Sequence, residues 1–259
     1  MRAPFTALFR PLPLLLAAVL AACNGSDNTA SPQQAPGEAQ RTSTRALEAG
    51  ADALQSRPPI EAINAYLNGF HFYSGAPDEQ MEAHHYCGYL NEEVIQCAIY
   101  DGNAKDAKLM GVEYIVSRKL FETLPAAEKP LWHSHVHEVK SGQLIAPGLP
   151  DAAERALMAR LVGTYGKTWH TWHTDRQKEL PLGVPQLMMG FTADGQLDAA
   201  LLAARNQRFG IDTEAKKRDR ASLASPPVAE GAHGSGGGPP VQLADPTGQD
   251  LNKAHQGPR

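Results

Sequence analysis

The sequence predicts a single α+β domain in which a largely antiparallel sheet carries a few packed helices. Short runs of strand-like sequence follow one another through the middle of the 259-residue chain. Two of these runs are separated by only three residues, which indicates a hairpin. The helical patterns between the runs are few and short. This order favours an α+β domain over a doubly wound parallel sheet, which needs strands and helices in regular alternation.

The expected strands are apolar, β-branched or aromatic runs bounded by turn residues. They lie at 69–74, 82–90, 94–101, 109–116, 132–144, 167–175 and 186–192. Helices are expected at 60–67 after Pro58-Pro59, at 117–124 and 151–162, where Ser117 and Asp151 serve as caps, and at 197–207. The sheet should therefore contain several hairpins, with the helices packed on one face or end.

Two cysteines lie in the hairpin at 82–101. If residues 91–93 form its loop, Leu90 faces Val94 and Cys87 lies directly opposite Cys97. A close cross-strand pair can form a disulfide, and an oxidising compartment would favour it. The alternative is that Cys87 joins His85 on one strand face as a metal ligand.

The first residues have the pattern of a targeting signal. A short apolar run follows Arg2 and Arg10 and ends Leu20-Ala21-Ala22-Cys23, which resembles a bacterial lipobox. We expect a signal peptide at 1–22, lipidation of Cys23 and membrane anchoring through it. Asn24 then favours the outer membrane of the cell envelope, facing the periplasm. The alternative is an ordinary signal peptide in which Cys23 has no role.

Composition divides the rest of the chain into three parts. Residues 23–49 are expected to form a flexible tether, residues 50–212 the folded domain, and residues 213–259 a disordered tail rich in charge, Gly and Pro. The formal net charge of -4 and the lack of a basic stripe argue against a nucleic-acid partner.

Histidines are the main functional lead, because eight of the ten lie between His71 and His173. In a strand at 132–144, alternate residues would place three of them on one face: His133, His135 and His137. The segment 84–87, His-His-Tyr-Cys, and the segment 170–173, His-Thr-Trp-His, add two further clusters. Crowding of this kind suggests one shared site.

The ligand set that we expect for a metal centre is His133, His135 and His170, with His84, His85 and Glu113 in reserve. Imidazole and carboxylate ligands suit one divalent first-row ion, such as iron, manganese, copper or zinc. Glu113 lies within an apolar strand, where a carboxylate must be paired, protonated or bound to metal. The alternatives are histidines that bond only to protein groups and an ion pair between Glu113 and Lys140 or Arg118.

Five segments of the sequence resemble one family. They are EAHHYCGYLNEEVIQCAIYD, LMGVEYIVS, LWHSHVHEVKSGQL, LVGTYGKTWHTWHTDR and LPLGVPQLMMGF, in this order. Together, over about 50–210, they closely resemble the oil body-associated proteins of plants, which have relatives in fungi and bacteria. Plant members are associated with seed lipid droplets, and the resemblance implies no established chemistry.

The family pattern also ranks the candidate residues. His137 and His173 fall at positions where the family accepts other residues, so both rank below the remaining histidines. Matching positions are His84, His85, Cys87, Glu113, His133, His135, Lys167, His170 and Asp175. The signal peptide, tether and tail depart from plant members and imply an envelope address in place of a droplet.

Three functions agree with these observations. The chain is an anchored binding or accessory module, a metal-dependent enzyme of unknown reaction, or a structural lipid-interface protein without a metal site. Bound metal separates the first two from the third, and turnover separates the second from the first.

Overall fold

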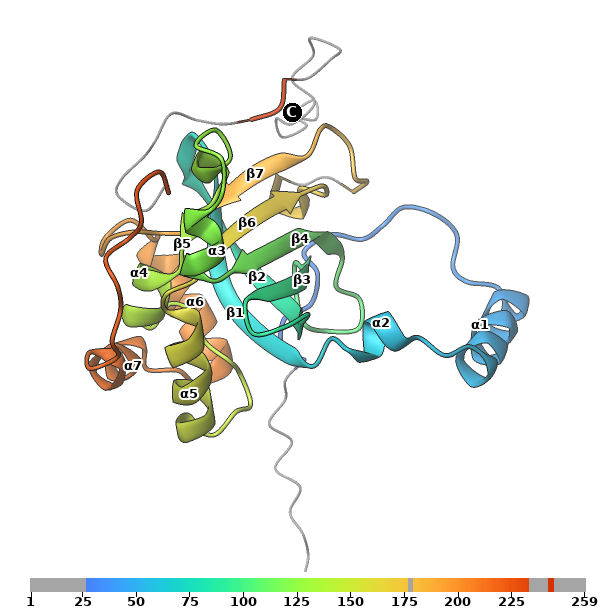
Figure 1. Ribbon diagram of the computed structural model, residues 1–259. Coiled ribbons are helices and arrows are strands. Elements are labelled where there is room, and N and C mark those ends of the chain that lie inside the picture. The colour runs from blue at the N-terminus through green and yellow to red at the C-terminus, as the bar shows by residue number, and fades with distance from the viewer. Residues whose placement is uncertain (1–26, 177–178, 233–241, 245–259) are drawn as a thin grey trace, which may run out of the picture.

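The computed structural model describes residues 27–176, 179–232 and 242–244 and contains one antiparallel sheet (Figure 1). Its seven strands have the order β4-β3-β2-β1-β7-β6-β5, and an additional pairing of β4 with β6 closes the sheet into a barrel. The strands are β1 (Ala65–Tyr73), β2 (Ala76–Tyr89), β3 (Val94–Tyr100), β4 (Leu109–Val116), β5 (His133–Ser134), β6 (Tyr165–His170) and β7 (Gln186–Met189).

Most of the helices gather on one side of the barrel in Figure 1, whereas α1 (Thr42–Leu54) and α2 (Pro58–Glu61) lie on the other side. The predicted single domain with a mostly antiparallel sheet and a few helices is confirmed; closure into a barrel was not predicted. The helices are α1 (Thr42–Leu54), α2 (Pro58–Glu61), α3 (Arg118–Glu122), α4 (Val136–Lys140), α5 (Asp151–Leu161), α6 (Ala199–Phe209) and α7 (Thr213–Arg220).

The predicted hairpin is present as β2 and β3. The side chain of Asn91 closes its loop by accepting hydrogen bonds from the backbone N–H groups of Glu93 and Val94, at 2.8 and 2.9 Å. This turn fixes the pairing of the two strands, and Cys87 lies directly opposite Cys97. The structure contains a disulfide between these two cysteines.

The prediction of one continuous strand at 132–144 is wrong. Only His133 and Ser134 form a strand, and the chain then turns into helix α4. His135 has helical dihedral angles (φ -82°, ψ 0°), and its carbonyl accepts from Val139 N–H at 3.1 Å, which is the first helical bond. A helix replaces alternation with a period of 3.6 residues, so His137 leaves the face that His133 occupies.

Two further boundaries differ from the prediction. The helix predicted at 60–67 ends at Glu61, and residues from Ala65 onward already belong to β1. The strand predicted at 167–175 ends at His170 and is followed by a short 3₁₀ turn, Thr174–Arg176. Gly111 and His170 are the last residues paired between β4 and β6, although β4 itself extends to Leu109.

The sequence predicted disorder from residue 213 onward. The structure instead contains a helix, α7, at Thr213–Arg220. The Arg220 side chain is fully buried and donates to the carbonyls of Val139 and Leu144, at 3.1 and 2.7 Å. It also pairs with Glu154 at 3.2 Å. These partners compensate a charge whose burial alone would be costly, which composition could not reveal.

The expected tether also differs in part. Residues Thr42–Leu54 form α1, whose side chains are not buried, and Thr29 and Ser31 bond to Asn103 and Asp101 of the domain. The segment expected to be a signal peptide, and Cys23, lie outside the described residues. Within the described part of the chain, no helix is both long and apolar enough to cross a membrane.

Alternation along the strands positions a polar centre inside the barrel. Leu67, Cys87 and Ile115 belong to an apolar cluster that also includes residues of α4 and α5. Residues on the same strand faces, two or four positions away, are instead His71, His85 and Glu113, all buried. The barrel interior is therefore apolar around Leu67, Cys87 and Ile115, and it is lined by imidazole and carboxylate groups around His71, His85 and Glu113.

Candidate metal centre

Four strands bring candidate ligands to the same interior face. His71 comes from β1, His85 from β2, Glu113 from β4 and His170 from β6. Each is 0–5% exposed. The pairing of Cys97 with both Cys87 and Glu113, and of Gly111 with His170, places these residues on one continuous face of the closed sheet.

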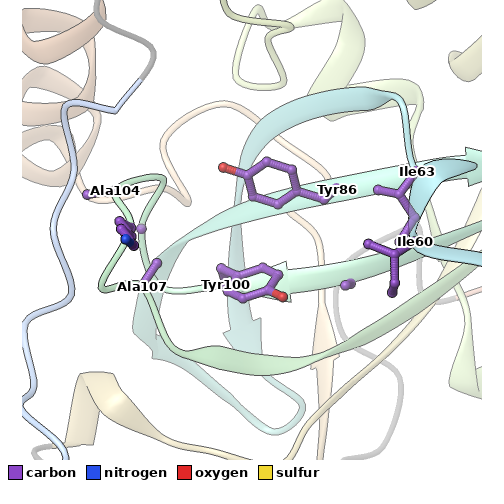
Figure 2. Close-up of a pocket in the computed structure, with 9 residues that line it drawn as sticks. Ile60, Ile63, Tyr86, Tyr100, Ala104 and Ala107 are labelled. Carbon is purple, nitrogen blue, oxygen red and sulfur yellow. The ribbon is translucent and has the colours of Figure 1, made fainter. Parts of the chain in front are cut away.

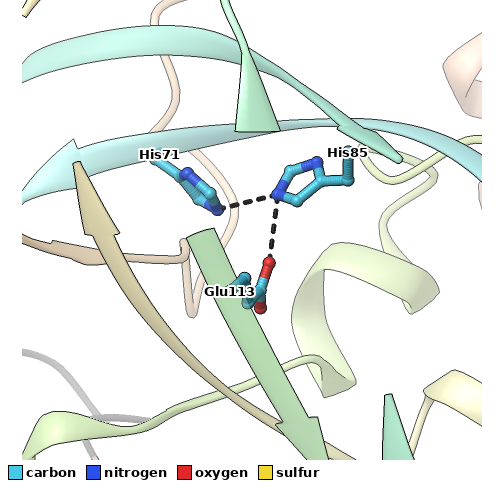
Figure 3. Close-up of side chains that lie close together, drawn as sticks. All are labelled: His71, His85 and Glu113. Carbon is cyan, nitrogen blue, oxygen red and sulfur yellow. Dashed lines mark hydrogen bonds and ion pairs between the residues drawn. The ribbon is translucent and has the colours of Figure 1, made fainter. Parts of the chain in front are cut away.

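Glu113 lies at the centre of this group. Its Oε2 is 3.1 Å from His85 Nε2, and its Oε1 is 3.1 Å from His135 Nε2 and 3.5 Å from His133 Nε2. Figure 3 shows His85 between Glu113 and His71. The two carboxylate oxygens therefore face different imidazoles.

His71 is the site residue that sequence reasoning missed as a ligand. Its Nε2 is 3.3 Å from His85 Nε2, and its Nδ1 is 3.4 Å from His170 Nε2. The available signal was the segment Phe70-His71-Phe72, in which a lone polar side chain interrupts an apolar strand. Two groups of three buried residues are close enough to hold an ion: His71, His85 and Glu113, and Glu113, His133 and His135.

A second carboxylate enters from α4. Glu138 is 4% exposed, and its Oε2 lies 3.9 Å from His133 Nε2. Two glycines leave room for the polar groups. A Cβ at Gly166 would overlap Glu113 Oε1 and lie 2.8 Å from His135 Nε2, and a Cβ at Gly190 would lie 2.6 Å from Glu138 Oε2. The absence of a side chain at Gly166 and Gly190 therefore provides the space that these carboxylates and imidazoles occupy.

The buried groups have shifted proton affinities. Burial alone would raise the pKa of Glu113, but hydrogen bonds from His135 and His85 outweigh it and hold this pKa well below its usual value. Burial would lower the pKa of His135, and Glu113 raises it instead. Burial raises the pKa of Glu138 to about 8 and lowers that of His170 to about 3. Without an ion, the structure thus favours an imidazolium at His135 paired with the Glu113 carboxylate, beside a protonated Glu138 and a neutral His170.

The hydrogen bonds of Thr164 fix the tautomer of neutral His135. Thr164 Oγ1 donates its single proton to the Leu161 carbonyl at 2.7 Å. It must therefore accept from His135 Nδ1–H, at 2.8 Å. The lone pair of a neutral His135 is then on Nε2, facing Glu113 Oε1 at 3.1 Å. Two lone pairs cannot bond to each other, so a proton or a metal cation must lie between them.

Three histidines of the sequence lie elsewhere. His84 faces the other side of β2, where its Nδ1 is 2.7 Å from Tyr66 Oη and its Nε2 is 3.4 Å from Glu82. His137 on α4 is 4.0 Å from Asp194. His173 is 3.2 Å from Tyr73 Oη. Of the six expected ligands, five gather inside the barrel and His84 does not.

The expected alternative partners of Glu113 are engaged elsewhere. Lys140 Nζ donates to the carbonyls of Ala221 and Leu223, at 2.7 and 2.8 Å. Arg118 pairs with Glu122 at 2.7 Å. The groups that meet the charge of Glu113 are therefore imidazoles, which are also metal ligands.

A separate pocket lies on the outer face of the barrel (Figure 2). It has a volume of about 360 Å³ and is lined mainly by apolar and aromatic side chains, among them Ile60, Ile63, Tyr86 and Tyr100. Tyr86 is on the same face of β2 as His84 and opposite to His85. This pocket is therefore not part of the histidine centre.

Known proteins resemble the chain over most of its length. The family model described as "Protein of unknown function (DUF1264)" matches residues 57–224. Oil body-associated protein 1B of Arabidopsis thaliana is 44% identical over 83% of this chain and 90% of its own length. Oil body-associated protein 1A of Zea mays is 44% identical over 83% and 87%, and protein 2A of Zea mays is 42% identical over 74% and 77%. No solved structure matches. The chain belongs to the oil body-associated protein family.

Proposed function

We propose that this chain is a lipid-anchored envelope protein that binds a divalent first-row metal ion inside its barrel. Glu113, His133 and His135 would hold the ion, with Glu138 beside them. The observation that carries this proposal is the approach of His135 Nε2 to Glu113 Oε1 at 3.1 Å, with Thr164 holding the lone pair of neutral His135 toward the carboxylate. A cation between the two atoms turns a repulsive contact into two bonds.

The spacing of the donor atoms supports the proposal. Bonds of about 2.0–2.1 Å at tetrahedral or octahedral angles place neighbouring donor atoms about 2.9–3.4 Å apart. The contact of Glu113 Oε1 with His135 Nε2, at 3.1 Å, lies within this range, and its contact with His133 Nε2, at 3.5 Å, lies just above it. Nitrogen and oxygen donors suit zinc, iron, manganese or copper, and the bound ion would supply a Lewis acid.

The Thr164 contact also supports the proposal, because metal-binding imidazoles usually donate their second N–H to a fixed partner. His135 does so through Nδ1. The competing arrangement is an imidazolium at His135 that needs no metal. The two arrangements differ in one measurable property, which is whether the chain takes up an ion.

The test is a competition titration with Zn²⁺ and a coloured chelator, on the full chain purified in detergent without a histidine tag. We expect tight binding by the wild type and a loss of at least about 100-fold in His135→Ala, since even partners of ligands contribute 10–100-fold. His84→Ala is the matched control, because His84 is equally buried but faces away from the centre. A wild type that takes up neither Zn²⁺ nor another first-row ion contradicts the proposal.

The membrane address is proposed from the Leu20-Ala21-Ala22-Cys23 junction. The names of the relatives place those proteins at oil bodies; for this chain we propose the envelope membrane, reached through acyl chains on Cys23. Cys23→Ala should release the chain from the membrane fraction or leave its signal uncleaved. Unchanged fractionation and mass in that variant contradict the proposed anchor.

A further inference from the structure

We propose that the barrel holds a second divalent ion, in a position formed by His71, His85 and the other oxygen of Glu113. Glu113 then bridges the two ions. This inference rests on the proposed function, because it places the second ion beside the first. It adds a second position and a shared ligand to the same centre.

The division of the imidazoles between the two oxygens of Glu113 is the first argument. Oε1 faces His133 and His135, and Oε2 faces His85 at 3.1 Å. His71 Nε2 lies 3.3 Å from His85 Nε2, on the Oε2 side (Figure 3). Each oxygen thus has its own pair of nitrogen donors, and the ligand atoms of each group of three residues lie within 4.8 Å of one another.

The count of protons is the second argument. His85 Nε2 has two close neighbours, Glu113 Oε2 and His71 Nε2. A single N–H can point well at only one of them, whereas an ion can bind all three atoms. His71 Nδ1 lies 3.4 Å from His170 Nε2. If His71 donates its proton there, the lone pair of its Nε2 is directed at the proposed position, and His170 orients the ligand without binding the ion.

The charge of the proposed two-ion centre is the third consideration. Glu113 and Glu138 bring two negative charges against four positive ones. Two positive charges remain, and water-derived hydroxide ligands, which bound divalent ions favour by lowering the pKa of water, would reduce this remaining charge. Paired ions of this kind are about 3.5–4 Å apart, a separation that a carboxylate bridge can span.

Two measurements on the full, tag-free chain in detergent test the inference. Elemental analysis after loading with Zn²⁺ should give two ions per wild-type chain, one in His71→Ala and two in the His84→Ala control. Electron paramagnetic resonance after loading with Mn²⁺ should show an exchange-coupled pair in the wild type and an ordinary six-line signal in His71→Ala. The wild-type spectrum needs no variant, so a folding defect in His71→Ala does not affect it.

The possible failures are distinct. One Zn²⁺ per wild-type chain overturns the second position and leaves the proposed function standing. Two Mn²⁺ without exchange coupling overturn the bridge. A wild type that binds neither metal overturns the inference and the proposed function together.

Discussion

Replacing Gly166 by alanine should abolish metal binding without removing a ligand. Gly166 lies on β6, and its missing side chain leaves the space that Glu113 Oε1 fills. The added methyl group would overlap this oxygen and approach His135 Nε2 and His133 Nε2 to 2.8 and 2.9 Å. The atoms that contact the new methyl group are therefore those proposed to hold the ion.

The size of the effect follows from this overlap. Glu113 Oε1 must retreat by about 1.5 Å to regain an ordinary contact of about 3.5 Å. Metal–ligand distances tolerate only about 0.2 Å, so the oxygen ceases to be a ligand. Overpacking itself costs about 1–3 kcal/mol, which lowers the melting temperature of the metal-free domain by about 2–12 °C.

Thermal unfolding with and without Zn²⁺ separates these effects. At a Zn²⁺ concentration about 1,000 times Kd, binding should stabilise the wild type by about 4 kcal/mol and Gly166→Ala not at all. The matched control is Gly163→Ala, on the same segment, because its added methyl group meets only Pro226 at an ordinary 3.5 Å. A Gly166→Ala chain that melts like the wild type and keeps the full Zn²⁺ shift would refute this reasoning.

Three further predictions concern the supports of the centre and of the barrel. Thr164→Val should weaken Zn²⁺ binding about 10–100-fold and cost about 1–3 kcal/mol of metal-free stability, because the buried His135 Nδ1–H loses its acceptor. Equal affinity in a chelator titration would contradict the tautomer assignment. Arg220→Ala should cost about 1–3 kcal/mol in urea unfolding, because the carbonyls of Val139 and Leu144 lose a buried donor while Glu154 keeps Lys216 and the Ala146 N–H as partners. Arg218→Ala, at an exposed position, should change stability by less than about 0.5 kcal/mol. Reducing the Cys87–Cys97 bond opens a link of sequence separation 10 and should cost about 2–3 kcal/mol; identical urea midpoints with and without reductant would exclude that contribution.

Local patterns predicted the parts of the fold that local interactions determine. The loop 91–93 and the strand-like runs around it predicted the pairing of Cys87 with Cys97, because the Asn91 turn fixes the register. The run Leu109–Val116 predicted β4 with its observed bounds. In both cases neighbouring residues supply the information, so no knowledge of distant contacts was needed.

Closure of the barrel and the position of α7 depend on distant contacts instead. β4 pairs with β6 across some fifty residues of intervening chain. Nothing in the sequence of either strand identifies the other as its partner. The charged segment of α7 resembled a solvated tail because its compensation is nonlocal. Arg220 finds its partners in Val139, Leu144 and Glu154.

The candidate site was predicted in part. His133 and His135 lie together as predicted, but not because they alternate along one strand. His133 belongs to β5, and His135 immediately precedes helix α4. Glu113 was predicted because it is a carboxylate within an apolar strand, and His85 because it lies in the histidine cluster at 84–87, where the sequence did not rank it above His84. His71 was missed because its only signal in the sequence, a histidine between two phenylalanines, indicates a buried polar side chain but does not identify a ligand. Only the closed barrel brings it to within 3.3 Å of His85.

Metal content of the chain isolated from the cells that produce it naturally, without a histidine tag, tests the central claim most directly. We expect a stoichiometric first-row metal ion in the wild type and in His84→Ala and its loss in Glu113→Gln, with a chelator lowering the melting temperature of the first two only. A wild type that carries no metal, takes up none when Zn²⁺, Mn²⁺, Fe²⁺ or Cu²⁺ is supplied, and melts at the same temperature with and without chelator would contradict the claim.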